Sequence, residues 1–350
     1  MGKRIVVVGA GAIGGYAGGH MARGGEDVTL IDPWPDHVNH MNEHGFRLDG
    51  VTTQECCTVP VKAIHLTDVQ ALSKGDPVDI AFISVKSYDT EWATALIKQY
   101  LAPDGFVVSL QNCMNEETVA RVAGEDRTVG CIASTIAAEL IGPGHVQRNV
   151  PLGGESHSVF RVGELHGRIT PRVEEVARLM RHADSAKATS NLWGERWTKL
   201  TINAMRNGLS AATGMSGKER DGDPMTRDVS IRLGAESIRV GWALGYRIEN
   251  LAGLAPERFV AAADGDAAAR ADVDSFMEAE ISKRSDDQRP SMGQDMQKGR
   301  RTEIDLINGF IAAQGDEIGI PTPVSKALVV AVKKVERGEI AASPENVAHI

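Results

Sequence analysis

Apolar residues follow one pattern in the first half of the chain and another in the second. In the first half, short continuous apolar runs alternate with longer amphipathic segments. Continuous runs are typical of parallel strands buried on both faces. The predicted strands are 4–8, 28–31, 79–85, 106–110 and 128–132, and the predicted helices include 89–101, 116–123 and 171–183. Residues 133–170 contain shorter β-like pieces, which we expect to form antiparallel strands that complete the sheet.

From Asn191 onward the apolar spacing is helical. The predicted helices are 192–212, 228–244, 266–284, 292–314 and 324–337, with a Gly- and Asp-rich loop at 214–224. The change predicts a domain boundary near 186–191. We therefore expect an α/β chain. An N-terminal Rossmann-type doubly wound sheet, residues 1–188, would bind a dinucleotide, and a C-terminal all-helical domain, residues 189–350, would carry the substrate and catalytic groups.

A glycine turn with the spacing G-x-G-x-x-G follows the first predicted strand, and an acid ends the second. Gly9 permits the tight turn, Gly11 lets a pyrophosphate approach the backbone, and Gly14 lets the helix pack against the strand. The helix N-terminus offers free N–H groups to the phosphates, and Asp32 can accept a hydrogen bond from a ribose hydroxyl. An ordinary glycine turn is the less favoured alternative. The cofactor-binding residues predicted here are Gly9, Gly11, Ala12, Ile13, Gly14 and Asp32.

Composition narrows the class of protein. The chain has 350 residues, a net charge of −9 and a pI near 5.6, which argues against a nucleic-acid or membrane-surface partner. It lacks a run of 18 apolar residues, so no membrane-spanning helix is expected. The four cysteines have no C-x-x-C spacing and predict reduced thiols in a cytoplasmic protein. The ten histidines are scattered along the chain, and no metal site is expected.

Two polar stripes mark the predicted helices of the second half. Lys199, Asn203 and Asn207 recur every four residues and share one helix face among apolar neighbours. An enclosed lysine beside two amides could donate a proton to a substrate oxygen, although a solvated face is an equally good interpretation.

The second stripe is Ser291, Asp295, Gly299 and Glu303, which also step by four along one predicted helix that starts near Pro290. A glycine inside a helix costs roughly 1 kcal/mol relative to alanine. Its position between two acids suggests that a ligand approaches there. A charged exterior face with a chance glycine is the alternative.

These motifs resemble the 2-dehydropantoate 2-reductase (ketopantoate reductase) family over nearly the whole length of the chain. The resemblance rests on the glycine turn and on further groups of residues: 84–86, 110–112, Lys199-x-x-x-Asn203-x-x-x-Asn207, 291–295, 301–309 and 319–323.

The resemblance implies a role for each matching residue. Lys199 would be the general acid, and Glu303 would help to hold the substrate and the lysine. Ser291 would contact the substrate carboxylate, and Asn203 and Asn207 would line the pocket. Lys86 and Asn112 would lie on the cofactor side of the site.

Three departures from the family pattern bear on cofactor and substrate. The family's basic residue after the second strand, which receives the 2′-phosphate of NADP, is replaced by Asp32-Pro33, so we expect NAD to be preferred over NADP. Cys113 stands where the family has glycine, and we interpret it as a small hydrophobe in a wider turn. Lys199 and Glu303 are 104 residues apart, further than in compact members, and the excess falls in 214–290.

The sequence therefore predicts an oxidoreductase that transfers a hydride between a nicotinamide cofactor and a small 2-oxo or 2-hydroxy acid or a related carbonyl compound, with Lys199 as general acid/base. Glu303 is expected within reach of Lys199, as a coupled titrating pair. One alternative is a hydroxyisobutyrate-type β-hydroxyacid dehydrogenase, although the glycine-rich stretch typical of those enzymes is absent before Lys199. The other is a dinucleotide-binding regulator without turnover. A homodimer is possible.

Overall fold

A mostly parallel sheet organises the first part of the chain. The computed structural model describes residues 2–281 and 289–350, which divide into two compact units, 1–192 (unit 1) and 193–350 (unit 2). Within the described part of unit 1, the main sheet has eight strands. From edge to edge they are β12 (Ala186–Ala188), β11 (Phe160–Glu164), β8 (Thr128–Ala133), β7 (Leu101–Ser109), β6 (Val78–Ile83), β1 (Arg4–Val8), β2 (Asp27–Asp32) and β5 (Lys62–His65). The five strands predicted from continuous apolar runs are all present, as the central strands β1, β2, β6, β7 and β8.

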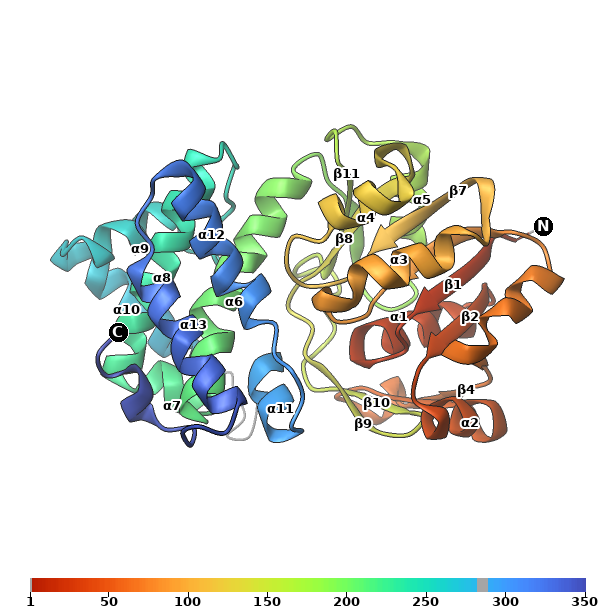
Figure 1. Cartoon of the computed structure of the whole chain (residues 1–350), viewed down its shortest axis with the longest axis horizontal. Helices are drawn as coiled ribbons and strands as arrows, with labels where there is room; N and C mark the ends of the chain where they lie inside the picture. Colours follow the sequence, from red (N-terminus) through yellow and green to blue (C-terminus); the bar gives the residue numbers. More distant parts are fainter. Residues whose placement is uncertain (1, 282–288) are drawn as a thin grey trace. The chain divides into compact units, whose positions relative to one another are not determined.

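Both faces of the sheet are covered, which explains those runs. Along β1, Ile5 and Val7 face one hydrophobic core while Val6 and Val8 face another, and all four are buried. Burying such a side chain contributes roughly 1.5–3 kcal/mol. Helices α1 (Ala12–Arg23) and α5 (Pro171–Met180) pack on the first side, and α3 (Thr90–Lys98) and α4 (Glu116–Ala123) pack on the second (Figure 1).

The segment expected to complete the sheet divides between two sheets. β11 pairs antiparallel with β8 and joins the main sheet, as predicted. The other strands of the segment do not, and this part of the prediction is wrong. They join two strands of the 46–59 region, which was not predicted, in a second sheet with the order β4 (Cys57–Val59), β3 (Phe46–Asp49), β10 (His145–Arg148) and β9 (Ala138–Gly142).

The second sheet packs against α1 at glycine positions. A side chain at Gly15 would begin 2.7 Å from the ring of Phe46, and one at Gly19 would begin 2.9 Å from Leu48. The extra glycines of α1 therefore allow a close approach of β3. The remaining helical segments of unit 1 are α2 (Pro35–His44) and the short 3₁₀ turns η1 (Thr53–Glu55), η2 (Leu66–Lys74), η3 (Ser87–Asp89) and η4 (Glu125–Arg127).

Unit 2 is helical in its described residues, as predicted. The predicted helix 266–284 is described as far as Ile281, and 282–284 lie outside the described residues. The helices are α6 (Leu192–Thr213), α7 (Gly217–Gly222), α8 (Pro224–Ala243), α9 (Pro256–Ala263), α10 (Ala267–Ile281), α11 (Ser291–Gln297), α12 (Asn308–Ile318) and α13 (Pro323–Glu336), with 3₁₀ turns η5 (Ile304–Leu306) and η6 (Pro344–Val347).

The predicted loop at 214–224 contains the short helix α7, so this prediction is wrong in part. Ser216 and Glu219 form a capping box, in which each side chain accepts a hydrogen bond from the backbone N–H of the other residue. These two bonds satisfy N–H groups that the start of a helix would otherwise leave unpaired.

The predicted single helix 292–314 is broken. α11 ends at Gln297, Gly299 has φ +61°, and the Arg300 N–H donates to the Asp295 carbonyl. This is a Schellman-type helix end, in which glycine takes the left-handed conformation. Ser291 and Glu303 therefore do not share a helix face, and Gly299 is a helix terminator rather than an interior glycine.

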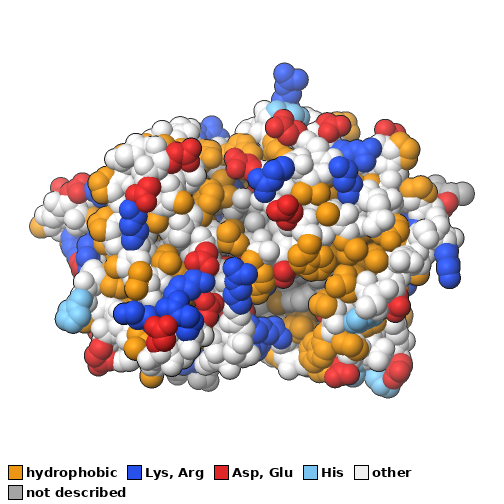
Figure 2. Space-filling model, viewed as in Figure 1, with side chains coloured by type: hydrophobic (Ala, Val, Ile, Leu, Met, Phe, Trp, Pro, Cys, Tyr) orange, Lys and Arg blue, Asp and Glu red, His pale blue; other side chains and the backbone are white. Residues whose placement is uncertain are grey.

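Charged side chains of opposite sign alternate on the surface over α13. Figure 2 shows Lys and Arg beside Asp and Glu there. Lys333 pairs with Asp305 and Glu336, and Arg337 pairs with Glu339. Such a mixed surface is typical of a solvated helix face.

Candidate active site

The glycine turn lies where β1 ends and α1 begins. Gly9 has φ +96°, and a side chain there would begin 2.9 Å from the backbone of Ser84. A side chain at Gly14 would begin 2.2 Å from the Gly9 carbonyl oxygen. Both positions therefore require glycine because of close packing. Gly11 differs, because a side chain there would meet nothing described within 4 Å. The space beside Gly11 is open for a ligand.

The N-terminus of α1 is free of a protein cap. Gly11 is the N-cap and makes no side-chain cap hydrogen bond, and the first turn, with Ala12 and Ile13, holds no acidic residue. The N–H groups of a first helical turn have no partner within the helix. This end of α1 can accept a phosphate.

Asp32 is held by the backbone. Its carboxylate accepts from the Ala10 N–H at 3.0 Å and from the Trp34 N–H at 3.0 Å. The side chain is only 9% exposed. Besides the ribose contact predicted for it, Asp32 therefore fixes the backbone of the glycine turn, a role that the sequence motif did not indicate.

Lys86 and Asn112 follow neighbouring strands, β6 and β7, at the same edge of the sheet. Gln111 ties the two loops together, because its amide donates to the Val85 carbonyl at 2.8 Å and to Thr90 Oγ1 at 2.9 Å. The Ser84 contact with Gly9 brings the loop after β6 beside the glycine turn.

A second amide strengthens this arrangement. Asn115 donates to Ser87 Oγ at 3.0 Å and to the Asn112 carbonyl at 2.7 Å. The sequence analysis did not single out Gln111 or Asn115 as positioning residues, and only their place beside Asn112 could have indicated it. Strand order reverses between β1 and β6, and ligands of such sheets bind at that switch point.

Cys113 has φ +62° and is buried. Its burial agrees with its interpretation as a small hydrophobe. Its backbone, however, takes the left-handed conformation that glycine adopts without strain.

The predicted catalytic stripe lies on α6. Lys199 and Asn203 are half-buried on one face of the helix, and Asn207 is buried. The Asn203 Nδ2 atom is buried and has no hydrogen-bond partner among the described residues. A buried donor without an acceptor costs about 1–3 kcal/mol. Asn203 therefore presents an unused donor, as a residue that binds a ligand oxygen would.

Ser291 lies beside this stripe. Asn207 Nδ2 donates to Ser291 Oγ at 3.4 Å. Two residues further along α11, a side chain at Gly293 would begin 2.6 Å from Ser210 Oγ. The structure thus brings Ser291 to Asn207 because α11 packs closely on α6.

Glu303 lies outside α11, in the segment that leads into η5. Glu303 is 3% exposed, and it is the residue immediately before η5. Ile304 lies against Gly208, and Asn308 Nδ2 donates to the Ala204 carbonyl at 3.1 Å. The residues on either side of the η5 turn thus pack on the part of α6 that carries Asn207. The contact expected between Lys199 and Glu303 remains a prediction.

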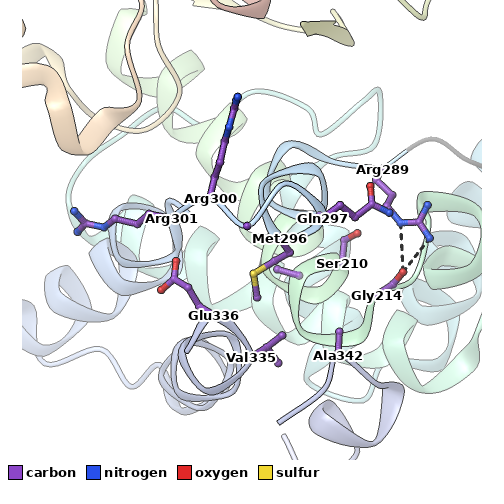
Figure 3. A pocket seen from close by; sticks show the side chains of 13 residues that line it. Ser210, Gly214, Arg289, Met296, Gln297, Arg300, Arg301, Val335, Glu336 and Ala342 are labelled. Carbon is purple, nitrogen blue, oxygen red and sulfur yellow. Dashed lines mark hydrogen bonds between the residues drawn. The ribbon is translucent and has the colours of Figure 1, made fainter. Parts of the chain in front are cut away.

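A separate cavity of about 480 Å³ lies within unit 2. Figure 3 shows three arginines at its rim, with side chains that point in different directions. Arg289 donates to the Gly214 carbonyl, while Arg300 and Arg301 extend away from it. None of the predicted site residues is among the described residues that line this cavity.

The sheet with its glycine turn, followed by a helical unit with a Lys/Asn stripe, defines the class: a nicotinamide-dependent oxidoreductase with a Rossmann-type unit. The ketopantoate reductase PanE/ApbA family model matches residues 5–155, and the model of its C-terminal part matches 191–336. The chain therefore belongs to the ketopantoate reductase family. It is an oxidoreductase, and membership of the family implies an NAD(P) cofactor. The two alternatives from the sequence, a hydroxyisobutyrate-type dehydrogenase and a regulator without turnover, are not favoured.

Curated relatives and solved structures agree with this assignment. A 2-dehydropantoate 2-reductase of Archaeoglobus fulgidus is 30% identical over 338 residues, covering 96% of this chain and 99% of the relative. A PanE/ApbA family ketopantoate reductase structure from Ralstonia eutropha has a TM-score of 0.77 at 27% identity, covering 96% of this chain and 99% of that one. A D-mandelate dehydrogenase structure with NADH and anilino(oxo)acetate has a TM-score of 0.78 at 21% identity over 96% and 98% of the two chains, and supports the fold alone.

Proposed function

We propose that the chain transfers a hydride between NAD(H) and a small 2-oxo or 2-hydroxy acid, 2-dehydropantoate being the first candidate because it is the substrate named for the curated relatives. The observation that carries the proposal is the buried Nδ2 of Asn203, which has no hydrogen-bond partner among the described residues and lies on the same helix face as Lys199. That amide is suited to bind a substrate oxygen.

Each predicted residue has a task in this proposal. Lys199 protonates the substrate oxygen as the carbonyl is reduced, and removes that proton in the reverse direction. Asn203 and Asn207 orient the substrate, and Ser291 binds its carboxylate. Glu303 holds Lys199 and the substrate in place. When bound, the nicotinamide supplies the hydride or accepts it.

Unit 1 supplies the cofactor site. Gly9 and Gly14 shape the turn, Gly11 leaves room for the pyrophosphate, and the N–H groups of Ala12 and Ile13 bind it. Lys86 and Asn112 line the cofactor side from the loops after β6 and β7. The residues present fit a dinucleotide because the space beside Gly11 is open and α1 has no protein cap.

NAD is the preferred cofactor in this proposal. Asp32 sits at the end of β2, where its carboxylate can accept from a ribose 2′-hydroxyl and repels a 2′-phosphate. Pro33 has no side-chain donor, and its carbonyl accepts from His65 Nε2 at 2.7 Å.

The proposal extends to domains and surroundings. Residues 1–188 form the dinucleotide-binding domain and 189–350 the substrate domain. We expect a cytoplasmic enzyme with a small-molecule substrate, no nucleic-acid partner and a possible homodimer; a dimeric ketopantoate reductase is known from Staphylococcus aureus. None of the described helices is long and apolar enough to cross a membrane. The residues described contain no group of three metal-ligating side chains.

The test is a spectrophotometric assay of NADH and NADPH oxidation with 2-dehydropantoate, straight-chain and branched 2-oxo acids, and an aromatic 2-oxo acid. We expect turnover with at least one acid and a higher kcat/KM with NADH. Cofactor binding without turnover of any acid would favour a regulator, and a clear preference for NADPH would overturn the cofactor assignment.

A further inference from the structure

One buried histidine connects the glycine turn to the second sheet. His37, on α2, is fully buried. Its Nε2 lies 3.0 Å from the Ala10 carbonyl oxygen, in the middle of the glycine turn. Its Nδ1 lies 2.8 Å from the backbone nitrogen of Gly144, in the turn between β9 and β10. The ring stacks on Trp34, with centroids 5.6 Å apart, and meets Phe46 edge-on.

These two contacts define the state of the imidazole. The Gly144 backbone N–H is a donor, so Nδ1 must accept and cannot carry a proton. A neutral imidazole then carries its hydrogen on Nε2, which donates to the Ala10 carbonyl. His37 is therefore held as the neutral Nε2–H form, and each of its nitrogen atoms has a backbone partner.

The bond to Ala10 determines where the next N–H points. In a planar trans peptide the carbonyl and the N–H of the following residue point in opposite directions. By holding the Ala10 carbonyl toward itself, His37 turns the Gly11 N–H to the other side. Asp32 holds the preceding peptide through the Ala10 N–H. The peptide groups on both sides of Ala10 are thus fixed before any ligand binds.

We propose that His37 is a positioning residue for the dinucleotide, which aims the Gly11 N–H at the cofactor pyrophosphate through its bond to the Ala10 carbonyl. The inference rests on the proposed function, because it requires that a dinucleotide binds at this turn. His37 does not touch the cofactor and acts through the Ala10–Gly11 peptide.

Two substitutions separate positioning from a purely structural role. The Nε2 of glutamine occupies a position like His Nε2, so His37→Gln keeps the donor to Ala10 and loses the acceptor for Gly144. The side-chain amide of asparagine corresponds to His Nδ1, so His37→Asn keeps the acceptor and loses the donor. Each variant removes one buried hydrogen bond, and we expect similar decreases in Tm.

The measurement is the Kd of the full-length protein for NADH by fluorescence titration. For His37→Asn we expect the Kd to rise roughly 5-fold to 10-fold, the effect of one misdirected hydrogen bond. For His37→Gln we expect a Kd within about 2-fold of wild type, and the same for His44→Asn, an exposed control on the same helix. Equal Kd values for His37→Gln and His37→Asn would overturn the inference.

A second measurement does not depend on whether the variants fold. Long-range ¹H–¹⁵N NMR of the wild-type protein should show His37 with a protonated Nε2 and an unprotonated Nδ1. The opposite tautomer would overturn the inference. Failure of wild type to bind NADH would instead refute the proposed function, so the two failures are distinguishable.

Discussion

At the residue scale, Lys199 carries the chemical hypothesis. It is half-buried on the same face of α6 as the unpartnered amide of Asn203. Lys199→Ala should lower kcat by roughly 100-fold or more, because it removes the proton donor. The Kd for NADH should hardly change. Steady-state kinetics and a cofactor titration check this, with Lys334→Ala, an exposed lysine of α13, as the control. A near-normal kcat in folded Lys199→Ala would instead favour the interpretation of Lys199 as part of a solvated helix face.

Asp32 yields a second prediction at this scale. Both carboxylate oxygens accept backbone N–H groups, so the amide nitrogen of Asp32→Asn would face a donor. The free energy of unfolding should fall by about 1–3 kcal/mol, the cost of a buried unsatisfied group. The kcat/KM with NADH should fall, and the preference for NADH over NADPH should narrow, because the charge that repels a 2′-phosphate is lost. An unchanged ratio of the two kcat/KM values would show that Asp32 does not select the cofactor.

Residue-level prediction worked best where one residue meets one local requirement. Gly9 and Gly14 are predicted from spacing, and each has a local reason: Gly9 has φ +96°, and a side chain at Gly14 would meet the Gly9 carbonyl oxygen of the same turn. The roles of Gln111 and His37 depend on partners in other loops. Their hydrogen bonds cross about 20 to 110 residues of sequence, and a single sequence does not indicate such pairings.

At the element scale, the break after α11 gives a prediction with a definite sign. If Gly299 were inside a helix, Gly299→Ala would stabilise unit 2 by about 1 kcal/mol. With φ +61° it should instead destabilise the unit by about 1 kcal/mol, because alanine is strained there. Urea unfolding measures the difference. Gly222→Ala is the control: this glycine is not among those with positive φ, and its side chain would have room. If Gly299→Ala stabilised the unit instead, the result would support the single helix 292–314 that the sequence predicts.

Element prediction was strongest for the central strands. β1, β6 and β7 are covered on both faces, so consecutive residues are buried and the sequence shows a continuous apolar run. β3 and β9 are only four and five residues long and carry polar residues, so they leave a weak pattern. The only sequence signal for the helix break was the single glycine at position 299. A glycine alone does not show whether it lies inside a helix or ends it.

At the scale of the whole molecule, sensitivity to acid should be concentrated in unit 1. Burial lowers the pKa of His20 to about 4, and the charges of Arg23, Arg148 and His182 act in the same direction. The Asp184 carboxyl is a second source of acid sensitivity in unit 1. Although burial raises its pKa, backbone N–H groups and the buried Arg148 guanidinium outweigh that effect and hold the pKa below its usual range. In unit 2, by contrast, burial raises the pKa of Glu236 above its ordinary value.

The signs of these shifts set the pH windows. The depressed pKa of His20 gives stability that is complete above its unfolded pKa of 6.5 and is lost as the pH falls toward 4, by roughly 3 kcal/mol in total. Asp184 loses its contribution at still lower pH, as the pH falls below its unfolded pKa of 3.8. Glu236 has the opposite sign, because a raised carboxyl pKa gives stability at low pH that is lost as the pH rises.

We therefore expect unit 1 to open before unit 2 on acidification from pH 7 to pH 4.5. Hydrogen exchange followed by mass spectrometry should show backbone amides of 2–192 losing protection first, because parts of a chain that form separate compact units need not open together. His20→Gln should remove most of the slope between pH 6.5 and 4.5, even if the variant is less stable at pH 7. His44→Gln, an exposed match on a neighbouring helix, should leave the slope unchanged. If both variants kept the wild-type slope, or if unit 2 lost protection first, His20 would not be the group that makes unit 1 sensitive to acid.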